Sequence, residues 1–280
     1  MTAFMALVRK QLADSRWLLG VTAVALFGLS WVFVWATDRL EARARRDTDP
    51  VASMRSSIGR HAFAKALGGP SADTSSTSLE VMFWRHPLVI LIAALWPISR
   101  GSIGVAGELE RGMLDLVLSR PVSRWSYLIT QLTSATIGLI VLGLAMLAGN
   151  QVGTYYNRIE APPGMLVLLK PVVNLLALAF SMYGVTLLLS TLDLVRWRPT
   201  LIASSLALAC YIAQVIANIP SLDNWKWLEH VSIFTAYDPV EAALQGHNLA
   251  FNAGILGAIG LTGVVLGLVV FQVRDLPTSG

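Results

Sequence analysis

Six stretches of about twenty mostly apolar residues divide this chain, and each is long enough to cross the hydrocarbon core of a bilayer. A run of that length with few charges predicts a transmembrane helix. We therefore expect an all-α membrane protein in which residues 1–280 form a single transmembrane domain. The predicted spans are about residues 17–36, 87–106, 129–149, 165–190, 201–219 and 252–272.

The composition also indicates a membrane protein. Hydrophobic residues make up 55% of the 280 residues and charged residues only 14%, whereas a soluble domain carries about a quarter charged residues. The net charge of +4 is modest, and no basic stripe alternates with aromatic residues as nucleic-acid binding would need. The single cysteine, Cys210, lies in an apolar run, which excludes a disulfide framework or a thiolate metal site within one chain.

Basic residues in the short segments predict the orientation. Six spans place both termini on one side, and short cytoplasmic flanks carry an excess of Lys and Arg. The opposite short loop, residues 150–164, contains only Arg158. We expect a multi-pass protein of the cell membrane with both termini in the cytoplasm. The flanks on the side of the termini contain Arg9, Lys10, Arg16, Arg111, Arg120, Arg124, Arg196, Arg198 and Arg274.

Three segments outside the spans have distinct patterns. Residues 1–16 carry apolar and charged side chains on opposite helical faces, which predicts an amphipathic helix in the membrane interface; a simple helical extension of the first span is the alternative. Residues 37–86 form a long external segment and could bind an extracytoplasmic protein. Residues 220–251 form an external, partly hydrophobic half-loop.

The sequence lacks common catalytic and metal-binding motifs. No GxxxxGK[ST] loop occurs, so the chain has no usual means of binding ATP. No HExxH helix occurs either, and the four histidines have no second ligand at a suitable spacing. We expect neither enzymatic activity nor a cofactor or metal site in this chain.

Few ionisable residues fall inside the spans. Arg100 could line a cavity or gate, or could instead extend to the interface or pair with a nearby carboxylate. The absence of a buried chain of Asp and Glu argues against a proton-coupled secondary transporter. Gly257, Gly260, Gly263 and Gly267 give the last span a thin face for close helix packing.

The polar segment 107–128, between the second and third spans, has the pattern of a small structured element. Glu108 and Glu110 favour the N-terminal end of a short helix, and Gly112 allows a sharp turn. Leucines at 114, 116 and 118 offer apolar contacts. Pro121 ends the element, and Ser123 is a suitable cap for the third span.

The residues from Gly107 to Arg124, GELERGMLDLVLSRPVSR, resemble the GE-x-E-x-GTLE-x-LLS-x-PVSR stretch of ABC-2-type permeases, the membrane subunits of one class of ABC transporters. Met113 stands where threonine is common, and Asp115 replaces the usual glutamate. In that family the stretch also follows the second of six spans.

The resemblance implies that this loop contains a coupling helix that docks on a separate P-loop ATPase subunit, which binds ATP and Mg. It also implies a second permease subunit, in a homodimer or heterodimer, with substrate exported between the two protomers. Spans one, two and five would then bring Arg100, Gln214 and Asn218 near the translocation path. The implied coupling residues are Glu108, Glu110, Arg111, Gly112, Met113, Leu114, Asp115, Leu118 and Pro121.

A second hypothesis is a non-transporting membrane scaffold or sensor whose external segment binds an extracytoplasmic partner. The apolar spans suit a lipid-like or amphipathic substrate, and they suit ordinary lipid-facing helices equally well.

Overall fold

In the computed structural model of this protein, the described residues are 3–46, 81, 83–114, 123–157, 159, 162–219 and 222–274. Every regular element among them is helical. The long helices are α1 (Ala3–Arg46), α4 (Pro87–Ser102), α7 (Arg124–Tyr156), α8 (Met165–Leu192), α9 (Trp197–Ala217) and α11 (Leu249–Val273). The short ones are η1 (Phe83–Arg85), the π-helical turn η2 (Ile103–Gly107), α5 (Glu108–Glu110), η3 (Asp223–His230), η4 (Ile233–Ala236) and α10 (Pro239–Leu244).

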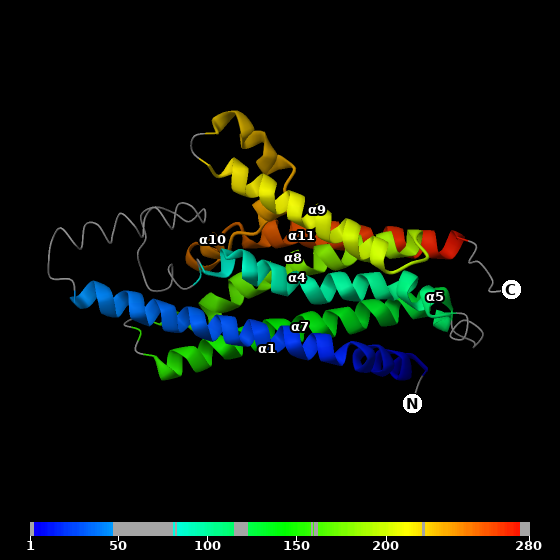
Figure 1. Ribbon diagram of the computed structural model, residues 1–280, viewed down its shortest axis with the longest axis horizontal. Coiled ribbons are helices and arrows are strands. Elements are labelled where there is room, and N and C mark those ends of the chain that lie inside the picture. The colour runs from blue at the N-terminus through cyan, green and yellow to red at the C-terminus, as the bar shows by residue number, and fades with distance from the viewer. Residues whose placement is uncertain are drawn as a thin grey trace.

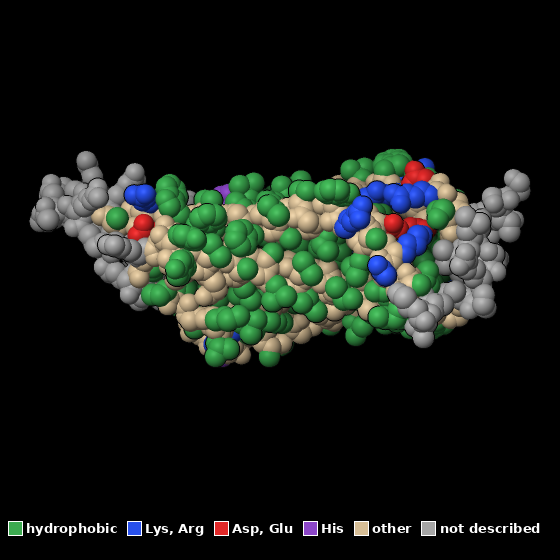
Figure 2. Space-filling model, turned by 90° about the horizontal axis from the view of Figure 1, so that it is seen from below, with side chains coloured by type: hydrophobic (Ala, Val, Ile, Leu, Met, Phe, Trp, Pro, Cys, Tyr) green, Lys and Arg blue, Asp and Glu red, His purple; other side chains and the backbone are tan. Residues whose placement is uncertain are grey.

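Six helical stretches in the described chain are long and apolar enough to cross a membrane, which confirms the predicted all-α fold with six spans. On the face in Figure 2, hydrophobic side chains cover a wide middle belt, and the charged side chains lie toward the ends of the molecule. The six helical stretches that could cross a membrane are Phe4–Arg39, Pro87–Glu110, Arg124–Tyr156, Met165–Leu192, Trp197–Ala217 and Leu249–Val273.

The long helices run along one another and alternate in direction (Figure 1). α1 packs along α7, α8 packs along α11, and α4 contacts α1, α8 and α9. The start of α1, the end of α11 and α5 lie at one end of the bundle, which we call the α5 end. α10 lies toward the opposite end, which we call the α10 end.

The N-terminal residues and the first span form one continuous helix, α1. This differs from a separate interfacial helix and corresponds to the alternative, a helical extension of the span. No proline interrupts residues 3–46, and Gln11 and Ser15 are buried against the bundle. The predicted external segment beyond Arg46 lies outside the described residues except for residues 81 and 83–86.

The half-loop between α9 and α11 is attached to the bundle at the α10 end. The Tyr237 hydroxyl donates to the Trp84 carbonyl oxygen at 3.0 Å, and Asn174 Nδ2 on α8 donates to the Ala236 carbonyl oxygen at 2.9 Å. Burial raises the pKa of Tyr237 above its usual value, so this hydroxyl keeps its proton. The loop is therefore fixed to α8 and to the residues that precede α4.

Glycines let α8 and α11 approach closely. A Cβ on Gly184 would lie 2.0 Å from the Gly260 carbonyl oxygen, and one on Gly263 would lie 2.5 Å from the Gly184 backbone. Gly257 instead faces open space, because it lies on the other side of Gly260 from Gly263, about 120° around the helix from Gly263. The predicted glycine face thus packs against α8 through Gly260 and Gly263 but not through Gly257.

We expect Gly263→Ala to destabilise the protein, because the added methyl group would press on the Gly184 backbone and overpacking costs about 1–3 kcal/mol. Gly257→Ala on the same helix meets nothing within 4 Å and should be neutral or stabilising. Thermal unfolding of the detergent-solubilised variants measures both effects. Equal melting temperatures for Gly263→Ala and the unchanged protein would contradict this account of the packing.

Candidate functional site

The wide turn η2 at the end of α4 is completed by a side chain from α8. Ser190 Oγ accepts hydrogen bonds from the backbone N–H groups of Val105 at 3.2 Å and Ala106 at 2.9 Å. The same hydroxyl donates to the Ser102 carbonyl oxygen at 3.0 Å. A π-helical turn removes backbone groups from the α-helical pattern, and buried backbone groups need partners. Ser190 therefore fixes the geometry of the segment that follows α4.

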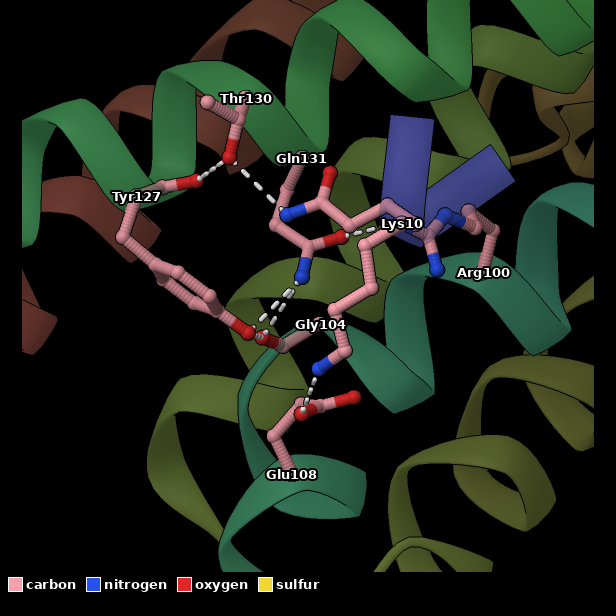
Figure 3. A network of polar contacts seen from close by, with 8 residues as sticks. Lys10, Arg100, Gly104, Glu108, Tyr127, Thr130 and Gln131 are labelled. Atoms are coloured by element: carbon pink, nitrogen blue, oxygen red, sulfur yellow. Dashed lines mark hydrogen bonds and ion pairs between the residues drawn. The ribbon is translucent and has the colours of Figure 1, made fainter. Parts of the chain in front are cut away.

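A buried network from α7 binds the same turn (Figure 3). The Tyr127 hydroxyl donates to the Gly104 carbonyl oxygen at 2.8 Å, and Gln131 Nε2 donates to the Tyr127 hydroxyl at 2.8 Å. Arg100 Nη2 donates to Gln131 Oε1 at 2.6 Å and to Ser134 Oγ at 3.0 Å. Arg100 is 2% exposed. These hydrogen bonds place Arg100 inside the contact between α4 and α7.

α1 joins this network through two neighbouring residues. Gln11 Nε2 donates to Thr130 Oγ1 at 2.9 Å, and Lys10 Nζ lies 3.7 Å from Glu108 Oε2. Glu108 is only 7% exposed. The Glu108 carboxylate therefore points inward, toward α1. Its ion pair with Lys10 connects the start of α1 to α5.

Glu110 connects α5 to the start of α9. Its Oε2 accepts a hydrogen bond from the backbone N–H of Arg196 at 2.9 Å, and Arg196 Nη2 donates to Ser99 Oγ on α4 at 2.9 Å. Partial burial lowers the pKa of Arg196 below its usual value; nearby Arg111 lowers it further, and Glu110 opposes the shift. Arg196 is a functional candidate that the sequence identified only as an orientation signal.

The next residues form an exposed turn, residues 111–113. Gly112 has φ +64°, the left-handed region that favours glycine, and its N–H donates to the Leu109 carbonyl oxygen at 2.9 Å. Arg111 and Gly112 are exposed, and Met113 is half-buried. Leu114 is fully buried. The other predicted coupling residues, Asp115, Leu118 and Pro121, lie outside the described residues.

The start of α7 confirms one predicted cap and reveals one unpredicted contact. Ser123 Oγ accepts from the Ser126 N–H at 3.1 Å. Arg124 Nη1 donates to the carbonyl oxygens of Phe271 and Arg274 at 2.9 Å each, and so closes the C-terminal end of α11. The sequence does not show which helix Arg124 reaches, because this contact joins residues far apart in the chain.

An apolar groove, which we call the α4/α9 groove, lies beside the site. It has a volume of about 400 Å³, within the range of ligand pockets. Its polar lining consists mainly of hydroxyl groups. The lining residues are Leu18, Pro87, Leu88, Ile90, Leu91, Ala94, Leu95, Ile98, Ser99, Met182, Thr200, Ser204, Ala207, Leu208 and Tyr211.

The residues expected near a translocation path fall into two places. Gln214 and Asn218 line a small pocket of about 50 Å³ together with Arg85 and Tyr237. Gln214 Oε1 there accepts a hydrogen bond from the Thr235 hydroxyl at 2.7 Å. Arg100 does not line this pocket; its hydrogen bonds join it to α7 instead.

The geometry of the site suits mechanical transmission. The exposed turn is joined to α1 through Glu108, to α9 through Glu110 and to α4 by the chain itself. In the described ranges, no three His, Cys, Asp or Glu side chains converge to hold a metal ion. A force on this turn would therefore reach α1 and α9 through polar contacts and α4 through the chain itself.

Comparison with known proteins identifies a family for this chain. The model of a family described as ABC-2 family transporter protein matches residues 5–276. No curated protein and no solved structure matches the chain.

We expect Gln131→Leu to destabilise the protein by about 3 kcal/mol, because it leaves the buried Arg100 guanidinium without its amide partner. The double variant Arg100→Met/Gln131→Leu should recover most of that loss, since it removes both partners. Denaturant unfolding in detergent measures the two free energies. An equally unstable double variant would show that the Arg100–Gln131 bond is not the cause.

We expect Ser190→Ala to cost about 2 kcal/mol or more, because the Val105 and Ala106 N–H groups lose a buried acceptor. Ser181→Ala is the matched control on α8, since the buried Ser181 hydroxyl donates only to Leu178 within its own helix. Unfolding of both variants under the same conditions makes the comparison. Similar losses for the two variants would argue against this role for Ser190.

Proposed function

The chain belongs to the ABC-2 family of transporter proteins, and we propose that it is a permease subunit that exports substrate when a separate ATPase pushes on its exposed turn. Family membership makes it a membrane component of an ABC transporter. The partner ATPase, the dimer and the direction of transport are the proposed parts.

The observation that carries the proposal is the attachment of the exposed turn. Residues 111–113 lie at the α5 end with Arg111 and Gly112 exposed, while Glu108 pairs with Lys10 and Glu110 accepts from the Arg196 N–H. A partner docked there would contact the turn and move α1, α4 and α9 together. Two of these helices, α4 and α9, border most of the groove.

The carboxylates and the exposed residues have different roles in this proposal. Glu108 and Glu110 hold the turn to its own chain. Arg111, Gly112 and Met113 offer the surface to the ATPase, together with the segment that contains Asp115, Leu118 and Pro121. ATP and Mg bind to the ATPase subunit, because this sequence has no phosphate-binding loop.

A second permease subunit, in a homodimer or heterodimer, would cover the open side of α9. Only 11% of the most apolar part of α9 is buried, against 61% for α8. Leu201, Leu208 and Ile212 are among its exposed side chains. Substrate would pass between the protomers along the α4/α9 groove, and the pocket at Gln214 and Asn218 would lie near its exit.

The charges and the docking role support an orientation. We place the α5 end and both termini in the cytoplasm, where ATP is available, and the α10 end outside. The basic residues of the short segments support this placement.

We expect Arg111→Glu to reduce copurification of a P-loop ATPase with the tagged full-length chain about tenfold or more, since charge reversal at an interface disfavours association. The matched control is Arg198→Glu, because Arg198 is exposed near the same end and pairs with Asp193 instead. Quantitative mass spectrometry of proteins purified from native membranes gives the measurement.

A further variant separates docking from transmission. Glu108→Gln weakens the internal ion pair and should leave ATPase association intact while lowering substrate-stimulated ATP hydrolysis. Failure of any ATPase to copurify, or equal association for Arg111→Glu and the unchanged chain, would refute the proposed docking turn.

A further inference from the structure

The α4/α9 groove has the shape of a site for one extended apolar chain. Its α4 side runs from Pro87 at the α10 end to Ser99 near the α5 end. Twelve residue steps at 1.5 Å per residue give a length of about 18 Å. Leu91, Ala94 and Leu95 lie along this side, so most of the groove offers only dispersion and hydrophobic contacts.

One end of the groove differs because a guanidinium binds one of its lining residues. Arg196 Nη2 donates to the groove-lining Ser99 at 2.9 Å. Thr200, which also lines the groove, donates its hydroxyl to the Arg196 carbonyl oxygen at 3.0 Å. Arg196 is only half-buried. A guanidinium has five N–H donors, so the bond to Ser99 leaves others for a ligand.

We propose that the α4/α9 groove binds an anionic amphiphile, with its apolar chain along α4 and its anionic headgroup at Arg196. This assignment deepens the proposed function, on which it rests for calling the bound molecule a transport substrate. Phosphate or carboxylate headgroups match the fork of a guanidinium, whereas the long apolar wall matches a hydrocarbon chain.

Charge complementarity favours this occupant over a helix from a second copy of the chain. Partial burial and the nearby charge of Arg111 both disfavour the charged form of Arg196 and lower its pKa, and Glu110 binds the Arg196 backbone N–H rather than its guanidinium. An anionic headgroup would stabilise the guanidinium directly. The apolar face of a second α9 could fill the groove, but it would bring no anion to Arg196.

The test compares two probes of equal chain length, dodecyl phosphate and zwitterionic dodecylphosphocholine, bound to the purified full-length chain in a non-ionic detergent. Native mass spectrometry measures both affinities. We expect the unchanged chain to favour dodecyl phosphate about tenfold, the scale of a charge-assisted hydrogen bond. Arg196→Gln should remove most of this preference while keeping the backbone N–H bond to Glu110, and Arg196→Lys should restore part of it.

Two controls make the result specific. Arg198→Gln, at an exposed arginine that pairs with Asp193, should leave the preference unchanged. Ala94→Phe narrows the groove and should lower the affinities for both probes by the same factor. Melting temperatures near that of the unchanged protein show that the variants are folded.

Equal affinities of the unchanged chain for the two probes would overturn the proposal, as would an unchanged preference in Arg196→Gln. A disulfide between Leu95→Cys of one copy and Ile212→Cys, on the exposed face of α9, of another copy would also overturn it by assigning the groove to a second copy. The binding test needs no ATPase, so it can fail while the ATPase copurifies. Conversely, the groove can bind dodecyl phosphate selectively while no ATPase copurifies, and this result would refute only the proposed docking turn.

Discussion

The π-helical turn η2 is the constraint on which the rest of the α5 end depends. It frees backbone groups deep in the protein, and these groups recruit partners from two other helices: Ser190 from α8 and Tyr127 from α7. Leaving buried polar groups of this kind unpaired costs stability. The turn is therefore most stable when α4, α7 and α8 hold this mutual position, and this makes it a firm base for the exposed turn that follows.

The charges around this base are arranged by depth. Arg100, the deepest, bonds to the uncharged Gln131 and Ser134, whereas Lys10 and Glu108 form an ion pair closer to solvent. Breaking a buried contact to a charged group costs more than breaking an exposed one. The outer contacts are therefore the less costly ones to break, while the inner network keeps the helices in register.

The sequence was sufficient for features that depend on local chemistry. Apolar run length predicted the six spans, and Ser123 was correctly expected to cap α7. It could not show that Glu108 turns inward to Lys10, because that contact joins residues far apart in the chain. The same limit applies to Arg196, whose role depends on Ser99 of another helix. Gly257 shows a related limit, since a glycine in a series packs only if its helical phase matches.

In the proposed function, Arg196 links the substrate groove to the exposed turn on which the ATPase acts. Its backbone N–H holds Glu110, and its guanidinium holds Ser99. An anionic headgroup would bind the N–H donors of the guanidinium that Ser99 leaves free. Binding would thus add the headgroup to the side chain that joins α9 to α4, while the backbone N–H of Arg196 keeps α9 attached to α5. A loaded groove would then transmit a push on the exposed turn to α9 differently from an empty one, which is the property that a substrate-stimulated transporter needs.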